Sequence, residues 1–134
     1  MIKAGLGGAL GVAAAAALSG CMAGDCETAV LDTLASPDAA HEVRVWSRAC
    51  AAQSRPTFQF ELVEAGAPQR DIARREQVFL VGQGERDDYQ LSWRAPGALT
   101  VELRAGADQV LKQEPDIQVG ERTVVISYGV IGYP

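Results

Sequence analysis

The sequence contains three cysteines, Cys21, Cys26 and Cys50, and their thiols are the most versatile chemical groups in the chain. A thiol can be acylated, oxidised to a disulfide, bound to a metal or used as a nucleophile. No two of the three cysteines have the C-x-x-C spacing of a redox pair. The residues around each cysteine must therefore decide which of these reactions applies to it.

The chain begins with the three parts of an export signal. Met1-Ile2-Lys3 supplies one positive charge, residues 4–18 form an uncharged run rich in Ala, Gly and Leu, and Ser19-Gly20 place two small residues before Cys21. These features are typical of a signal peptide that is removed from the mature protein. The apolar run is too short and too rich in glycine for a membrane-spanning helix, which needs about 20 apolar residues.

The segment Leu18-Ser19-Gly20-Cys21 resembles the lipobox of bacterial lipoproteins. The resemblance implies cleavage before Cys21, a diacylglycerol on its thiol and an acylated new amino terminus. Residues 1–20 would be a lipoprotein signal peptide, and residues 21–25 the lipidated N-terminus with a short tether. Met22 replaces the Asp that retains such proteins at the inner membrane, which favours the outer membrane, facing the periplasm. The alternative is an ordinary secreted protein with Cys21 as a free thiol.

Once Cys21 carries lipid, Cys26 and Cys50 remain as the thiols of the mature domain. An exported protein matures in an oxidising compartment, which favours a disulfide between these two residues. The chain-entropy model assigns a disulfide of this loop length about 3–4 kcal/mol of stability, a large share for a small domain. We expect residues 26–134 to form a single β-domain.

The balance of charge limits the partners of the mature chain. The full sequence has a formal net charge of −5, and removal of Lys3 with the leader makes the mature chain one charge more negative. Binding to nucleic acid depends on Lys and Arg side chains that neutralise phosphates, so we expect no nucleic-acid partner. An acidic domain also has no overall electrostatic reason to lie on anionic lipid. We therefore expect the acyl chains on Cys21 to supply the contact with membrane lipid.

A search for catalytic and metal-binding groups yields few candidates. His41 is the only histidine, so a histidine-based zinc site lacks further ligands, and no serine lies in a G-x-S-x-G elbow. We expect His41 to be a solvent-facing or edge residue at the start of a strand. Asp87 and Asp88 are weak evidence for a catalytic carboxylate pair, because adjacent residues on a strand point to opposite faces. The sequence predicts no catalytic residue, no metal and no cofactor.

Two polar segments could nevertheless bind ions. Residues 82–88 combine two glycines with clustered acids that could hold Ca²⁺, but they lack the order of an EF-hand loop and the ending of a phosphate-binding loop. We interpret this segment as a solvated hairpin connection. Residues 70–76 carry three arginines that could meet an acidic partner or a phosphate. Two acids interrupt these arginines, which favours a mixed-charge solvated segment.

The elements that must position these groups follow a hydrophobic pattern with a period of two. Apolar and polar residues alternate in most of six short segments, 43–48, 58–63, 78–81, 89–93, 99–103 and 123–128. Such segments, separated by Gly, Pro and Asp, are typical of strands. The clearest hairpin joins residues 89–93 to 99–103 through Pro96-Gly97. The sequence predicts an all-β fold, a small antiparallel sandwich or partly closed barrel of about six to eight strands.

Two segments fit this pattern less well. Residues 27–34 are ambiguous between a strand and a helical turn, and residues 71–77 have only weak helical spacing and are equally compatible with a loop.

Trp46 is the residue with the most ambiguous position. In the predicted strand it alternates with Val43 and Val45 and shares a face with Arg44 and Arg48. An exposed tryptophan between two arginines would be a partner-binding anchor, because Trp and Arg are enriched at interaction hot spots. The alternative is that both faces of the strand are covered and that Trp46 belongs to the core.

The mature part is loosely similar to a family of small uncharacterised exported proteins and lipoproteins. Its members share a cysteine, a Ser-Pro-Asp turn, a strand ending in a second cysteine, a tryptophan and a final Val-x-Ile-x-Tyr strand, which correspond here to Cys26, Ser36-Pro37-Asp38, Cys50, Trp93 and Val124–Tyr128. This chain departs from the pattern at Ala39 and Ala51, where the family has Gly. The resemblance implies pairing of the two cysteines and transfers no catalytic residue.

These observations give one leading hypothesis for function and one alternative. The leading hypothesis is a membrane-anchored envelope lipoprotein whose β-domain is non-enzymatic and binds another component, such as an envelope protein. The alternative is an inhibitor of a cell-wall hydrolase such as lysozyme, a role that small disulfide-bonded β-proteins of the envelope sometimes have.

Overall fold

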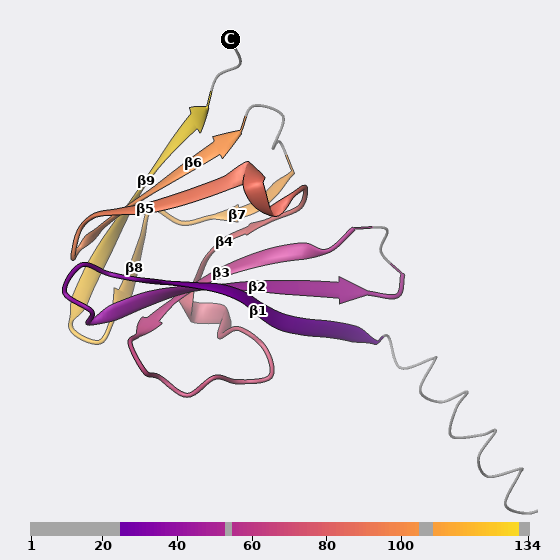
Figure 1. Cartoon of the computed structure of the whole chain (residues 1–134), viewed down its shortest axis with the longest axis horizontal. Coiled ribbons are helices and arrows are strands. Elements are labelled where there is room, and N and C mark those ends of the chain that lie inside the picture. Colours follow the sequence, from indigo (N-terminus) through magenta and orange to yellow (C-terminus); the bar gives the residue numbers. More distant parts are fainter. Residues whose placement is uncertain (1–24, 53–54, 105–108, 132–134) are drawn as a thin grey trace, which may run out of the picture.

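The computed structural model describes residues 25–52, 55–104 and 109–131. The described strands form two sheets that pack face to face as a sandwich (Figure 1). The first sheet has the order β1 (Cys26–Ala35), β2 (His41–Cys50), β3 (Thr57–Glu64), β4 (Val78–Gly82), β7 (Val110–Gln113). The second sheet has the order β5 (Tyr89–Ala95), β6 (Ala98–Arg104), β9 (Arg122–Ile131), β8 (Asp116–Val119). Neither sheet closes into a barrel, so the prediction of a sandwich is confirmed.

The six predicted strand segments all lie within observed strands, and the predicted hairpin is β5–β6. Its register pairs Tyr89 with Leu103 and Trp93 with Leu99. The structure adds β1, β7 and β8, which bring the strands of the described ranges to nine. One pair, β6 and β9, is parallel, because the chain visits β7 in the first sheet and β8 in the second before β9. The fold is therefore a mixed sandwich. Among the described residues, no helix has the length and apolar character needed to cross a membrane.

The ambiguous segment 27–34 is part of strand β1. It pairs antiparallel with β2 along almost its whole length, from Cys26 opposite Cys50 to Ala35 opposite Glu42. The register shifts between Val30 and Asp32. Bulges of this kind are a common feature of edge strands, where they discourage pairing with further chains.

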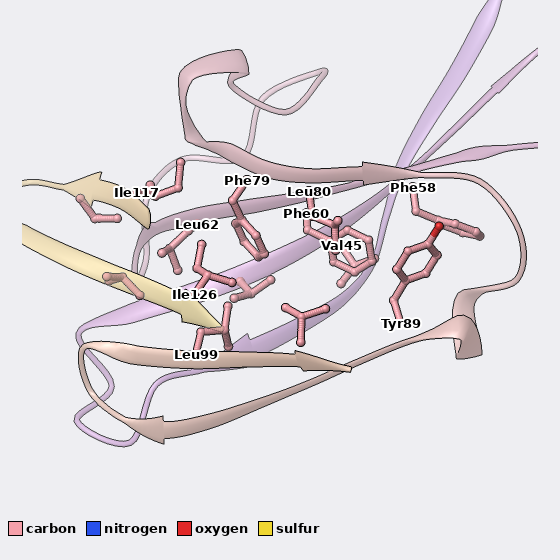
Figure 2. Packing of buried hydrophobic residues seen from close by; sticks show 14 of the residues in the cluster. Val45, Phe58, Phe60, Leu62, Phe79, Leu80, Tyr89, Leu99, Ile117 and Ile126 are labelled. Carbon is pink, nitrogen blue, oxygen red and sulfur yellow. The ribbon is translucent and has the colours of Figure 1, made fainter. Parts of the chain in front are cut away.

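The core lies between the two sheets and is almost entirely apolar. Side chains from both sheets interdigitate there, among them Val45, Phe60 and Leu62 from the first sheet and Leu99 and Ile126 from the second (Figure 2). Tyr89 is completely buried, and its ring lies 5.3 Å from that of Phe60. Gly82 makes room for Tyr89, since a Cβ atom at this position would lie 2.1 Å from the Tyr89 hydroxyl oxygen.

The outer face of the first sheet is covered by the connection between β3 and β4. We call this connection, residues 65–77, the strap; it ends in a single 3₁₀ turn, η1 (Arg75–Gln77). Ala73 of the strap packs against Trp46 and Val78, which form a second and smaller buried cluster. Figure 1 shows the strap as the long loop that follows β3. The weak helical pattern over 71–77 thus corresponds to a loop with one short turn.

Candidate functional site

The structure joins the two cysteines of the mature domain. A disulfide links Cys26 to Cys50, at the end where the chain enters β1 and leaves β2. The predicted lipidation site, Cys21, and the signal peptide, residues 1–20, lie outside the described residues. The first cysteine of the disulfide follows the predicted lipidation site by five residues in the sequence.

The structure decides between the two interpretations of Trp46. Trp46 is 3% exposed and Arg44 is 6% exposed, because the strap covers both, and only Arg48 is exposed. The alternative, in which both faces of the strand are covered, is confirmed. The sequence pattern could not distinguish the two, because it does not show what covers the outer face.

A network of polar contacts holds the strap against the sheet. Glu61 is 2% exposed, and its carboxylate accepts hydrogen bonds from Trp46 Nε1 at 2.9 Å and from the backbone N–H of Arg74 at 2.7 Å. Arg44 forms an ion pair with Glu42 at 2.8 Å and donates to the carbonyl of Ala67. We call these six residues, Glu42, Arg44, Trp46, Glu61, Ala67 and Arg74, the polar clamp. Each buried charge in the clamp has a partner, which satisfies the usual condition for burying charge.

Beside the clamp, the strap leaves a hollow of about 310 Å³ on the outer face of the first sheet. We call it the strap hollow; Arg48 of β2, Lys112 of β7 and Arg75 of the strap line it, over a floor that includes Val78 and Val81. No carboxylate is among the described residues that line it. Two arginines of segment 70–76 thus line different hollows, since Arg75 lines the strap hollow and Arg74 lines another one.

A second recess lies at the end of the sandwich opposite the disulfide. Two adjoining hollows share Glu64, Val119 and Gly120, and we call them together the end groove. The hollow beside the strap has a volume of about 340 Å³ and includes Gln77, whereas the other includes His41. The groove therefore brings together the end of β3, the strap, the start of β2 and the β8–β9 turn.

His41 is not the solvent-facing or edge residue that the sequence predicts. It is 6% exposed, because it pairs with Glu64 of β3 and because the 36–40 turn folds back onto it, with Ser36 Oγ accepting its backbone N–H at 3.1 Å. Its Nδ1 atom is buried and has no hydrogen-bond partner. Gln77 Oε1, on the strap side of the groove, is also buried without a partner. Buried polar atoms are nearly always paired, so both call for a partner such as water or a ligand.

The shape of the groove depends on Gly120. This residue has a φ of 61°, in the left-handed region that favours glycine. A Cβ atom at Gly120 would lie 2.7 Å from Glu64 Oε1, so the carboxylate rests directly against the turn. No hydrogen bond or ion pair engages the Glu64 carboxylate in the described part of the chain. Glu64 is exposed and therefore open to an incoming donor.

The turn beside the groove holds a carboxylate, Asp38, whose pKa is perturbed by its hydrogen-bond donors. The Asp38 carboxylate accepts hydrogen bonds from the Ser36 hydroxyl at 2.7 Å, from the Ala40 backbone N–H at 3.2 Å and from Arg122 at 3.0 Å. These contacts, led by the hydroxyl, lower the pKa of Asp38 to about 2. Ala39 within this turn has a φ of 59°, a conformation that glycine adopts more readily.

Two tyrosines have raised pKa values, and the hydroxyl of each has a structural role. Burial raises the pKa of Tyr89, and its hydroxyl donates to the Gln83 carbonyl. Burial likewise raises the pKa of Tyr128, whose hydroxyl donates to the Glu114 carbonyl at 2.6 Å. Both hydroxyls are thus neutral donors that tie the two sheets to their connections, and neither is poised to act as a nucleophile.

The acidic segment 82–88 is not the hairpin connection that the sequence predicts. β4 and β5 belong to different sheets, so residues 83–88 cross between them and form the 3₁₀ turn η2 (Arg86–Asp88). Asp88 accepts the backbone N–H of Glu85 at 2.9 Å, which caps this turn locally. Across residues 25–52, 55–104 and 109–131, no three His, Cys, Asp or Glu side chains gather in a way that could hold a metal ion.

Sequence reasoning missed the end groove. Glu64, Gln77 and Gly120 are separated by up to 56 positions along the chain, and none belongs to a motif. The only local signal is Gly120-Glu121, a turn-forming pair that follows a short strand. Comparison of the chain with family models, with curated proteins and with solved structures found no match in any of the three.

Proposed function

We propose that this protein is a lipid-anchored, non-enzymatic binding domain of a bacterial envelope, and that it binds an envelope component in the end groove. One observation carries the binding site. The buried polar atoms His41 Nδ1 and Gln77 Oε1 lack partners, and the residues that bear them line the two halves of one groove. The anchor is supported by the signal-shaped leader and by the lipobox-like sequence that ends at Cys21.

The position of the groove relative to the predicted anchor supports this proposal. From Cys26, strand β1 runs across the first sheet for ten residues, or about 33 Å (Figure 1). The groove lies at the far end of this strand. Only four residues separate Cys21 from Cys26. A domain tethered by so short a segment holds its opposite end away from the membrane, where it meets other envelope components.

The chemistry of the groove indicates a ligand that donates hydrogen bonds. Gln77 Oε1 is an acceptor only, and the ionised carboxylate of Glu64 is also an acceptor only. A ligand with amide or amine N–H groups would satisfy both. An amine would in addition be attracted by the charge of Glu64 and of the neighbouring Glu121.

The proposal is tested by in-cell crosslinking of the tagged, full-length protein, followed by mass spectrometry of the proteins that co-purify. The test variant combines Glu64→Ala with Gln77→Ala. A matched control combines Glu102→Ala with Gln90→Ala, since these exposed residues pair on the second sheet. We expect the groove variant to lower recovery of a specific partner about tenfold, equivalent to ~1.4 kcal/mol, and the control to leave it unchanged.

Two outcomes would contradict the proposal. If the groove variant and its control retain the same partner equally, the groove is not the binding site. If Cys21→Ser leaves the protein in the membrane fraction, the lipid anchor is wrong. Thermal unfolding of each variant would show whether a lost partner reflects a lost fold.

A second candidate function is inhibition of a cell-wall hydrolase such as lysozyme. The observation that favours it is the position of Glu64 and Glu121, which places two exposed carboxylates among the loops at the end of the sandwich away from the anchor. This candidate predicts that a stoichiometric amount of the protein slows turnover of cell-wall substrate by the enzyme. Unchanged turnover at stoichiometric excess would eliminate it.

A further inference from the structure

The strap hollow has the composition of an anion site, although the protein as a whole is acidic. Arg48, Arg75 and Lys112 approach it from three separate elements. None of the three forms an ion pair within the described residues. The only hydrogen bond of their side chains there is one of 3.4 Å from Lys112 Nζ to the carbonyl of Arg75. Three unpaired cations around one recess attract a negatively charged group more strongly than any of them does alone.

The hollow is also suited to the apolar part of such a ligand. Val78 and Val81 form part of its floor, and Ile72 at its rim is 61% exposed. Gln59 adds an uncharged hydrogen-bonding group to the lining. The recess thus combines cations with apolar surface, which fits a phosphate attached to a chain or glycerol better than it fits a free ion.

The position of the hollow narrows the choice of ligand. Arg48 lies two residues before Cys50, whose disulfide partner Cys26 is five residues after Cys21. Five residues span at most about 17 Å, so an anchor on Cys21 keeps the hollow within reach of the bilayer surface. A tether of this length makes the membrane that holds it the ligand of highest effective concentration.

We propose that the strap hollow binds the phosphate of an anionic lipid headgroup in the membrane that holds Cys21. The part of the outer face near the disulfide then rests against this membrane, with Ile72 at the contact, while the end groove at the opposite end of the sandwich stays away from it. This inference rests on the lipid anchor of the proposed function and adds an orientation to it. It also revises the expectation from net charge, because three cations line one recess even though the chain as a whole is acidic.

The test uses the full-length lipidated protein in phosphatidylcholine vesicles with and without phosphatidylglycerol. A fluorophore is attached in the variant Ile72→Cys, and spin labels on the lipid headgroups quench it at close range. The matched control is Val125→Cys, since Val125 is 53% exposed on the second sheet. We expect quenching at position 72 only with phosphatidylglycerol, and we expect added salt to reduce it. Equal quenching at position 72 in both kinds of vesicle would overturn the proposal.

Removal of the cations provides the second arm. The variant Arg48→Gln, Arg75→Gln, Lys112→Gln should weaken docking by roughly fivefold for each charge removed. The control Arg94→Gln, Arg104→Gln removes exposed charges from the second sheet and should leave docking unchanged. If the triple variant docks like the parent protein, the hollow does not bind the headgroup.

A third arm separates this proposal from its alternatives. The mass of the purified protein shows whether Cys21 is acylated, which tests the anchor alone. If it is not acylated, co-sedimentation of the soluble domain with the same vesicles must still depend on phosphatidylglycerol and on the three cations, or the proposal fails. If inorganic phosphate protects the domain against thermal unfolding while the vesicles give no quenching at position 72, the ligand is a free phosphate and the lipid assignment is wrong.

Discussion

The inner face of the first sheet packs against the second sheet through apolar side chains, whereas its outer face is covered by the strap. On the inner face, Val43, Val45 and Leu62 are almost completely buried without any polar partner. On the outer face, Arg44 and Glu61 are buried to nearly the same degree, but each depends on specific hydrogen bonds. One sheet thus carries two kinds of core.

The difference teaches where this molecule can carry function. Apolar packing is non-directional and fills space, so the inner face leaves little room for a ligand. The strap touches the sheet at the polar clamp and at a small apolar cluster, and recesses remain at its margins. Both proposed binding sites lie at these margins, one at the end of the strap and one beside it.

The largest expected effect comes from the inner face. Phe60 is completely buried and packs against Phe79 and Tyr89. The variant Phe60→Ala should lower the free energy of unfolding by about 3–5 kcal/mol, because it removes a large side chain and leaves a cavity. Urea unfolding followed by tryptophan fluorescence measures this, with the exposed Ser127→Ala as control. A loss below about 1 kcal/mol would show that the two faces do not differ as described.

The disulfide stabilises the edge of the outer face, because Cys50 lies on the same side of β2 as Arg48 and Trp46. The chain-entropy model predicts that Cys26→Ser with Cys50→Ser lowers the free energy of unfolding by about 3–4 kcal/mol. Comparison of the oxidised parent with the variant in the same urea experiment measures the effect. Equal midpoints would mean that strand pairing alone holds this edge.

A smaller effect is expected from the polar clamp. The variant Glu61→Ala leaves Trp46 Nε1 and the backbone N–H of Arg74 without an acceptor, and should cost about 2–3 kcal/mol. A double-mutant cycle with Trp46→Phe should give a coupling of about 0.5–3 kcal/mol, since the two side chains share a hydrogen bond. Strict additivity would show that the strap is held by packing alone. Hydrogen exchange should also be faster in the strap than in β2 and β3.

The smallest expected effect concerns the exposed turn beside the end groove. Because the folded-state pKa of Asp38 is lowered from 3.8 to about 2, its stabilising contribution is fully present above pH 3.8 and is lost as the pH falls through about 2. Asp38→Asn should therefore remove a small part of the stability that the parent protein loses between pH 3.8 and about pH 2. Unfolding midpoints of the two proteins, measured from neutral to acidic pH, test this prediction. Parallel profiles would contradict the role of the Ser36 hydroxyl.

Much of the fold was predictable because strands leave a local trace in sequence. The alternation at 89–93 and 99–103 and the intervening Pro96-Gly97 turn predict β5, β6 and their pairing. β7 and β8 were not predicted, because four residues are too few to establish a period. The crossing of residues 83–88 between sheets was also missed, since a polar connection looks the same whether it joins neighbouring strands or different sheets.

The sequence by itself predicted six of the strands and the pairing of Cys26 with Cys50, because each depends on residues that are close together or few in number. The anchor at Cys21 stays a prediction. Only the tertiary structure decided that Trp46 is buried, that His41 lies against a groove and that three cations meet in one recess. These properties depend on what covers each face of a strand. Covering segments such as the strap are positioned by contacts between residues far apart in the chain, and no local pattern records those contacts.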